Sequence, residues 1–250
     1  MLVTSAIIPA DTAGAAGSIT RRWRLSGLSH TDPQPAGGEP LSNHLEWLEP
    51  QDVDLVFKPG PLDKLFASVV RTRRSTRAIA AASLEQVAQI VRETLKADFV
   101  GYGEKQGRRL KSVLSAGAIH PVKAVILRRD NRPIVYDDGR DLFLSVQVRD
   151  HSAYISFFQT CESVLPEAEG HWVALFADCR NVRRLYANHE SLAWRDAGAV
   201  IQMMALMAED HEMAFCPLGV LGGEIIKALL PETPDIIPVG VVALGKRAEG

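Results

Sequence analysis

Cysteine is scarce in this chain, and the spacing of its cysteines matches no common metal-binding or redox motif. The 250 residues contain three cysteines, Cys161, Cys179 and Cys216. No pair has the Cys-x-x-Cys spacing of thiolate zinc sites or redox motifs. An odd, scattered set argues against a disulfide framework and favours a cytoplasmic protein. We expect each cysteine to be a small buried apolar residue rather than a nucleophile.

The short motifs of several enzyme classes are also missing. No Gly-x-Gly-x-x-Gly follows a strand pattern, which argues against a dinucleotide held in a Rossmann fold. There is no Walker segment, no His-Glu-x-x-His pair and no Gly-x-Ser-x-Gly elbow. The sequence therefore predicts neither a metal site nor the hydrolases that carry these motifs.

A strong charge of one sign and a long apolar run are absent as well. The formal net charge is -2, with 46% hydrophobic and 23% charged residues, as in ordinary soluble domains. This balance indicates no general attraction to nucleic acid or anionic lipid. No apolar run is long enough to span a bilayer. Met1–Ala10 is apolar but lacks the basic start of a signal peptide, so we expect none.

Proline and glycine interrupt the first sixty residues, where long helices cannot form. We expect residues 1–60 to be an irregular tail that continues as an extended arm, and residues 61–250 to form the main domain. The arm would be anchored on that domain or on a partner subunit by its larger apolar side chains, namely Leu45, Trp47, Leu48, Val53, Leu55 and Phe57.

Helical and strand patterns interleave in residues 61–250. The predicted helices are Pro61–Val70, a helix capped by Ser83 and Gln86, Ser152–Gln159, Ala193–His211 and Glu224–Leu230. The predicted strands are Val122–Arg128, Pro133–Asp137, Trp172–Asp178 and Ile237–Leu244. Lys96–Leu110 and Pro217–Gly223 are predicted loops, and Asp141–Arg149 fits a short helix or a strand. Hairpins beside crossovers indicate an α+β sandwich with a mixed, mainly antiparallel sheet flanked by helices.

Two short segments have the composition of a ligand site. Residues 71–77 read Arg-Thr-Arg-Arg-Ser-Thr-Arg, and a guanidinium group offers a planar fork of donors to phosphate oxygens. Residues 115–121 read Ser-Ala-Gly-Ala-Ile-His-Pro, a turn whose small side chains let backbone approach a flat ligand. Taken singly, the first also fits a solvated helix end and the second a plain turn before a strand.

Together and in this order, the two segments resemble the start of the flavin-dependent nitroreductase superfamily. Members carry an Arg-Arg/His-Ser-x-Arg segment followed by a turn that contains Pro-Ser. The turn at Ser115–Pro121 is most similar to the SagB-type branch, which dehydrogenates azoline rings in ribosomal peptides. The resemblance extends from about Leu62 to Lys246. It implies a nitroreductase-like sandwich, bound FMN, and a homodimer in which each flavin touches both chains.

The resemblance also implies which residues bind the cofactor. Arg73, Arg74, Ser75 and Arg77 match the first flavin-binding segment of the family, with contacts to phosphate, ribityl and pyrimidine edge. Ser115 stands where the turn serine approaches the flavin of the partner. Backbone amides face the ring in the family loop that matches Cys216-Pro-Leu-Gly219, so Leu218 and Gly219 are candidates. Lys246 and Arg247 match a basic phosphate contact. Residues 216–219 and 246–247 also fit a plain turn and a basic tail.

The implied catalytic pair is incomplete. Azoline oxidases carry a Lys-Tyr pair before the long helix, and the corresponding residues here are Leu185 and Tyr186. Leucine cannot take a proton, and Arg184 stays protonated. Tyr186 is therefore the candidate catalytic residue, although a half-buried packing role also fits it. His120 is a second candidate because it can relay protons near neutral pH. His189 and Glu190 could also serve as a base.

These observations predict an FMN-dependent oxidoreductase, with dehydrogenation of a peptide-derived azoline or similar natural-product intermediate as the leading reaction. One alternative is a nitroreductase-like reductase of small molecules with NAD(P)H as transient electron donor. Another is a scaffold subunit of a biosynthetic complex, together with other enzymes, that has lost catalysis. We expect a homodimer because the helix Ala193–His211 has an apolar surface too broad for one side of a small core.

Overall fold

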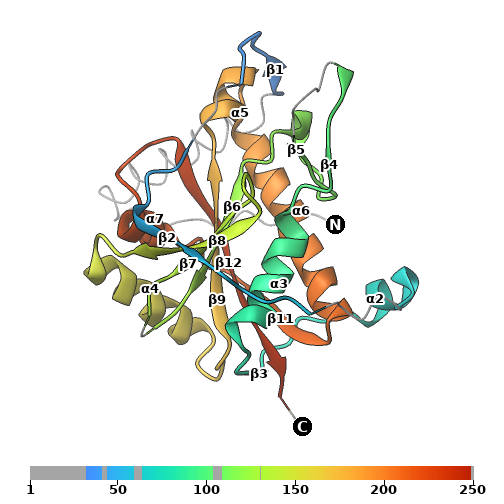
Figure 1. Ribbon diagram of the computed structural model, residues 1–250, viewed down its shortest axis with the longest axis vertical. Coiled ribbons are helices and arrows are strands. Elements are labelled where there is room, and N and C mark those ends of the chain that lie inside the picture. The colour runs from blue at the N-terminus through green and yellow to red at the C-terminus, as the bar shows by residue number, and fades with distance from the viewer. Residues whose placement is uncertain (1–31, 41–43, 59–63, 104–108, 130, 249–250) are drawn as a thin grey trace, which may run out of the picture.

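An antiparallel sheet of eight strands forms the centre of the molecule (Figure 1). The computed structural model describes residues 32–40, 44–58, 64–103, 109–129 and 131–248. The strand order is β11 (Met213–Leu218), β12 (Ile236–Arg247), β9 (His171–Asp178), β6 (Val122–Leu127), β7 (Ile134–Asp137), β8 (Leu142–Gln147) and β2 (Leu48–Val53). β3 (Ile79–Ala80) pairs with the end of β12. The pairings within this sheet are antiparallel, which confirms the predicted α+β class.

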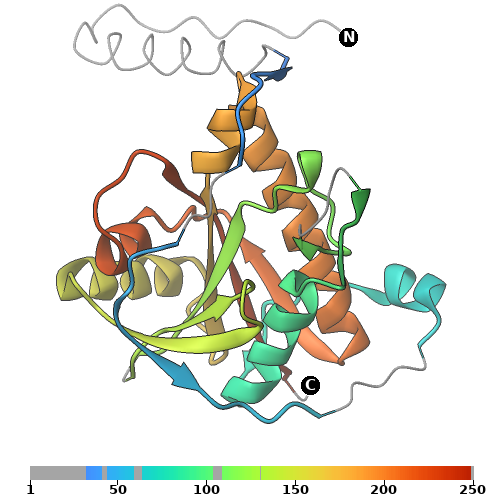
Figure 2. The same ribbon diagram turned by 45° about the horizontal axis from the view of Figure 1, so that its top comes forward.

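Helices cover both faces of the sheet (Figures 1 and 2). One face carries α3 (Leu84–Leu95) and α6 (Glu190–Asp210), and the other carries α4 (His151–Val164) and α7 (Gly223–Leu229). Strand β9 contributes to both cores: Val173, Leu175 and Ala177 to the first, and Trp172, Ala174 and Phe176 to the second. Burial on two sides explains why this strand reads as a continuous apolar run.

Local sequence signals set several boundaries. The backbone N–H of Gln86 donates to the Ser83 hydroxyl at 3.3 Å, and the Ser83 N–H donates to the Gln86 side chain at 3.1 Å. This capping box starts α3 where the sequence predicts it. The three cysteines are buried and unpaired. Burial raises the pKa of the Cys161 and Cys179 thiols to about 12, so neither is a ready nucleophile.

Other boundaries differ from the prediction. β11 continues through Leu218, so the predicted loop at Pro217–Gly223 begins too early; an outer strand tolerates a proline. A short helix, α5 (Arg180–Leu185), was not predicted, and α6 begins at Glu190 rather than Ala193. Two short strands, β4 (Phe99–Val100) and β5 (Arg109–Leu110), lie within the predicted loop Lys96–Leu110. Asp141–Arg149 contains strand β8.

The N-terminal arm lies along the sheet edge. β2 pairs with β8, and the apolar residues of the arm pack on the cores of both faces: Leu45 and Trp47 on the α4 side, and Val53, Leu55 and Phe57 on the α3 side. Further upstream, β1 (Gln34–Pro35) pairs with β10 (Tyr186–Ala187), and the Ala36 N–H donates to the Leu185 carbonyl at 2.9 Å. Residues 1–31 lie outside the described residues.

Helix α2 (Phe66–Thr72) exposes most of its apolar side chains to solvent. It forms part of the predicted helix Pro61–Val70, whose first residues lie outside the described ranges. Of its apolar stripe, Val69 is buried, whereas Leu65 and Phe66 are 79% and 73% exposed. α2 therefore stands away from the body of the chain, as Figure 2 shows. Within the described part of the chain, no helix has both the length and the apolar character to cross a membrane.

Candidate functional site

The predicted phosphate residues gather at one end of the sheet. The arginine segment 71–77 begins in the last turn of α2 and leads toward β3. The Thr76 N–H donates to the Phe215 carbonyl at 2.9 Å, which attaches the segment to the outer strand β11. Lys246 and Arg247 lie opposite Ala80 and Ile79 of β3. The fold thus brings two basic segments from opposite ends of the domain together, and we call Arg73, Arg74, Arg77, Lys246 and Arg247 the cationic cluster.

A buried glutamate at the end of α6 holds this region in place. Arg247 donates to one oxygen of Glu209 at 2.8 Å, and the Thr72 hydroxyl donates to the other at 2.8 Å. The ammonium group of Lys64 donates to the Glu209 carbonyl at 3.0 Å. Glu209 therefore ties α2 and the end of β12 to the same turn of α6. Glu209 was not predicted from the sequence, although an acidic residue within an apolar helix indicates a buried charge that needs partners.

The arginine side chains of the cluster are open to solvent. Arg74 and Arg77 are exposed, and Arg73 is half-buried. One guanidinium nitrogen of Arg74 donates to the carbonyls of Arg71 and Arg73, at 2.7 and 2.8 Å. Ser75 is exposed beside them. Guanidinium groups that are not buried in ion pairs remain accessible to a bound anion.

Leu218 and Gly219 lie at the other end of the same outer strand. Leu218 pairs with Val241, three residues beyond Phe215, to which the arginine segment is attached. Three residues of strand span about 10 Å. Gly219 is exposed, and a side-chain carbon added there would meet no atom within 4 Å. The cationic cluster and the Leu218–Gly219 corner therefore share one open edge of the sheet.

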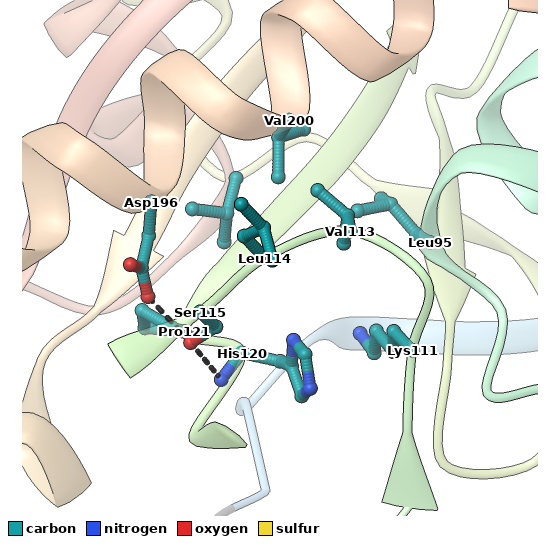
Figure 3. Close-up of a pocket in the computed structure, with 10 residues that line it drawn as sticks. Leu95, Lys111, Val113, Leu114, Ser115, His120, Pro121, Asp196 and Val200 are labelled. Carbon is teal, nitrogen blue, oxygen red and sulfur yellow. Dashed lines mark hydrogen bonds between the residues drawn. The ribbon is translucent and has the colours of Figure 1, made fainter. Parts of the chain in front are cut away.

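The serine turn is built on a second buried acid of α6. The Ser115 hydroxyl donates to one oxygen of Asp196 at 2.5 Å, and the Ala116 N–H donates to the other at 3.2 Å. The Ser115 oxygen also accepts the His120 N–H at 2.8 Å (Figure 3). Burial raises the pKa of Asp196, and these hydrogen bonds oppose that rise. The hydroxyl predicted to approach a flavin thus organises the turn.

The turn itself has unusual backbone angles. Gly117, Ala118 and His120 have φ values of 61°, 54° and 52°, in the left-handed region. For residues other than glycine this region costs of order 1 kcal/mol or more. A side-chain carbon on Gly117 would lie 2.7 Å from the Tyr186 hydroxyl oxygen. A glycine is required at this position because Tyr186 lies directly against the turn.

The two catalytic candidates lie on either side of this turn. Tyr186 is half-buried in β10, rather than directly before a helix, and lines a hollow of about 250 Å³. The N-terminal arm forms one wall of that hollow. Its other lining residues are Pro35, Gly37, Gly38, Gly117, Ile119 and Leu185. Residues 32–40 therefore cover the position of Tyr186, and Leu185 contributes an apolar wall beside it.

His120 faces a different environment on the inner side. Its ring is buried beside Lys111 (Figure 3), whose ammonium group donates to Asp138 at 2.5 Å. Lys123 donates to the other oxygen of Asp138 at 2.6 Å. Burial, assisted by the positive charge of Lys111, lowers the pKa of His120 to about 4, so the ring is neutral at pH 7. Sequence analysis did not find the charged residues around His120.

A single chain does not bring the two halves of the predicted cofactor site together. The serine turn is fixed to Asp196 and the cationic cluster to Glu209, and both acids belong to α6. Thirteen residues of helix span about 20 Å. Ser115, His120 and Tyr186 thus lie near the start of α6, whereas Arg247 lies near its end.

Comparison with known proteins identifies the fold. No protein-family model matches the sequence, and a search of curated protein sequences finds no similar one. Solved structures do match. A protein from Ralstonia eutropha described as a nitroreductase has a TM-score of 0.58 and 11% identity, covering 88% of this chain and all of its own. A second, from Anabaena variabilis, has a TM-score of 0.52 and 13% identity, covering 73% of this chain and 38% of its own. This chain has the nitroreductase fold.

Proposed function

We propose that this chain is an FMN-dependent oxidoreductase. The observation that carries the proposal is the cationic cluster, which adjoins an open strand edge ending in Leu218 and Gly219. Guanidinium and ammonium groups suit the phosphate of FMN, and the open space at Gly219 suits a flat ring. The nitroreductase fold supports the same reading, because the basic residues and the Leu218–Gly219 corner that resemble flavin segments of the family lie on this edge.

We further propose that two copies of the chain complete each site. The two predicted halves are about 20 Å apart within one chain, since thirteen residues of α6 separate their anchors. α6 also leaves an open face: Trp194 is 45% exposed, and no atom lies within 4 Å of a side-chain carbon added at Gly198. A twofold dimer through this face would bring the serine turn of one copy toward the cationic cluster of the other.

In this proposal each group has a defined role. Bound FMN supplies a carrier of two electrons, while the protein supplies binding and orientation. Arg73, Arg74 and Lys246 would hold its phosphate, and the backbone at Leu218 and Gly219 would contact its ring. The Tyr186 hydroxyl relays the proton that the substrate loses or gains. The arm at Pro35 and Gly38 limits the access of water to that hydroxyl.

As the specific reaction we propose dehydrogenation of a peptide-derived azoline. The support is the similarity of the Ser115–Pro121 turn to the SagB-type branch, together with a tyrosine in contact with that turn. Such a ring loses two electrons and two protons on aromatisation. Leu185 replaces the lysine of the branch, so Tyr186 is the residue we assign to proton transfer.

Flavin binding is tested by colour and titration. Purified protein should be yellow, and stripped protein should take up added FMN. Arg74→Ala and Lys246→Met should each weaken FMN binding by about tenfold to a hundredfold, because a hydrogen bond to a charged group contributes about 1.5–3 kcal/mol. Arg140→Ala, which removes an exposed arginine elsewhere on the chain, is the control. A colourless protein that fails to take up FMN would refute the proposal.

The reaction is tested by giving the loaded protein two substrates. An azoline-containing peptide, supplied without oxygen, should bleach the bound flavin and yield the azole. Bleaching by NAD(P)H followed by turnover of a nitroaromatic compound would instead identify a small-molecule reductase. Flavin-loaded protein that is inert to both would favour the scaffold alternative and contradict the assignment as an enzyme.

A further inference from the structure

A polar cavity lies beside the serine turn, next to the hollow that contains Tyr186. Its volume is about 280 Å³, and its charged or polar lining residues include Arg109, Lys111, His120, Lys123 and Asp138. They come from β5, β6, the serine turn and the segments that precede the turn and follow β7. The fold therefore gathers them from five places in the chain. We call this space the basic cavity.

Positive charge dominates the basic cavity. Lys111 and Lys123 each donate to a different oxygen of Asp138, at 2.5 and 2.6 Å. An ammonium group has three N–H donors, and the bond to Asp138 uses one of them. Arg109 lines the same cavity as a third cation, and its charge acts on Lys111. The side chain of Lys111 is only 2% exposed, so its charge acts in a poorly solvated place.

His120 gives an independent sign of a missing ligand. The residue is 9% exposed, and among the described residues neither ring nitrogen has a hydrogen-bond partner. Buried polar atoms without a partner are rare in proteins, and each calls for an explanation. The backbone that carries the ring is held in place, because the N–H of His120 donates to the Ser115 hydroxyl and its φ lies in the left-handed region.

We propose that the basic cavity binds the anionic oxygens of a small ligand, a carboxylate or a phosphate group. Lys111, Lys123 and Arg109 would balance its charge, and His120 would donate a ring N–H to one of its oxygens. The two lysines already hold one carboxylate, that of Asp138, by one donor each. A ligand oxygen on their open side would use the donors that remain.

The basic cavity adjoins the hollow that contains Tyr186. Ile119 and Leu185 line both the basic cavity and the hollow that contains Tyr186. An anionic group held by the lysines would therefore leave the rest of its ligand facing Tyr186. A cavity of this size accommodates a small acid or the acidic end of a larger molecule, and not a whole flavin. The proposal does not rest on flavin binding, since the cationic cluster lies about 20 Å away along α6.

Binding is measured by calorimetry on the full chain without added flavin, with succinate and inorganic phosphate as probes. At least one probe should bind to the unmodified protein. Lys123→Met and Arg109→Met should each weaken that binding by about tenfold or more, because each removes one charged contact. Arg109 is exposed, so its variant retains the fold even if Lys123→Met does not. Lys227→Met, which removes an exposed lysine of α7, should bind as the unmodified protein does.

The ring of His120 provides a direct readout. In nitrogen-labelled protein, succinate or phosphate should shift the imidazole resonances of His120 and leave those of exposed His151 unchanged. Absence of binding, or equal weakening in Lys227→Met, would overturn the proposal. Phosphate binding that is lost in Arg74→Ala but kept in Lys123→Met would assign phosphate to the cationic cluster and would also overturn it, unless succinate still required Lys123.

Discussion

The hydroxyl of Ser115 lies 2.5 Å from the carboxylate of Asp196, on the buried face of the central helix α6. This contact fixes the serine turn, since the same hydroxyl accepts the His120 N–H and the same carboxylate accepts the Ala116 N–H. Of the two functional candidates, His120 belongs to that turn and Tyr186 lies against it. Ser115, which was predicted to approach the flavin, therefore also stabilises the turn.

The first prediction concerns stability. Ser115→Ala should lower the free energy of unfolding by about 1–3 kcal/mol, because buried Asp196 loses a partner and the His120 N–H loses its acceptor. Ser112 provides a matched control, since its hydroxyl donates to Asp98 at 2.6 Å on the surface. Urea denaturation of Ser112→Ala should show a much smaller loss. Equal losses would mean that the Ser115 network contributes no more than a surface contact.

The second prediction concerns pH. His211 lies 2.7 Å from Glu93, and this hydrogen bond raises the pKa of His211. Its stabilisation is fully present below the unfolded value of about 6.5 and is lost as the pH rises through the folded pKa. His120 acts in the opposite sense: burial lowers its pKa to about 4, so stability falls as the pH falls from about 6.5 toward 4.

Two variants separate these limbs in chemical denaturation. His211→Gln should remove a loss of about 0.2–1 kcal/mol that sets in as the pH rises above about 6.5, and leave the loss at acid pH unchanged. His120→Gln should make the free energy of unfolding less dependent on pH between about pH 6 and pH 5. It should leave the loss at higher pH unchanged. Exposed His151→Gln should alter neither limb. A profile in which the two variants affect the same limb would contradict the assignment.

Features with a local cause could be predicted from the sequence. The capping box at Ser83 depends on residues three apart, and the apolar run of β9 follows from burial on both faces. The helix α5 was missed because Arg180–Leu185 is short and carries no apolar stripe; among its residues only Val182 is buried. Pro217 was assigned to a loop because proline has no N–H to donate within a sheet. Its strand lies at the sheet edge, where no neighbouring strand needs that N–H.

The predicted site shows the same division. The basic composition of residues 71–77 and 246–247 was visible, but their joining depends on β3 pairing with β12. The basic cavity could not be predicted from the sequence, because Lys111 and Asp138 meet only when β6 and β7 have paired as a hairpin. Residue type indicates which chemistry is available. Pairing in the folded sheet decides where that chemistry is assembled.

The third prediction concerns assembly. Gly198→Leu should leave the fold of one chain intact, because no atom lies within 4 Å of the added carbon and leucine favours a helix more than glycine does. If α6 forms the dimer interface, the side chain should weaken dimerisation and FMN retention together. Light scattering measures the first and absorbance the second. Lys227→Leu introduces the same side chain at an exposed position of α7 as a control. A Gly198→Leu dimer of unchanged affinity would exclude this face.

The last prediction concerns Tyr186. Tyr186→Phe keeps the ring against Gly117 and removes only the hydroxyl, so the turn and the arm should stay in place. FMN occupancy should not change, since the proposed phosphate contacts come from the cationic cluster and not from the Tyr186 hydroxyl. Turnover should fall by about a hundredfold or more if the hydroxyl relays a proton. Anaerobic flavin reduction by substrate measures this step directly. Tyr102→Phe, at a tyrosine that is 90% exposed, is the matched control. Equal turnover in Tyr186→Phe and the unmodified protein would restrict Tyr186 to packing against the serine turn.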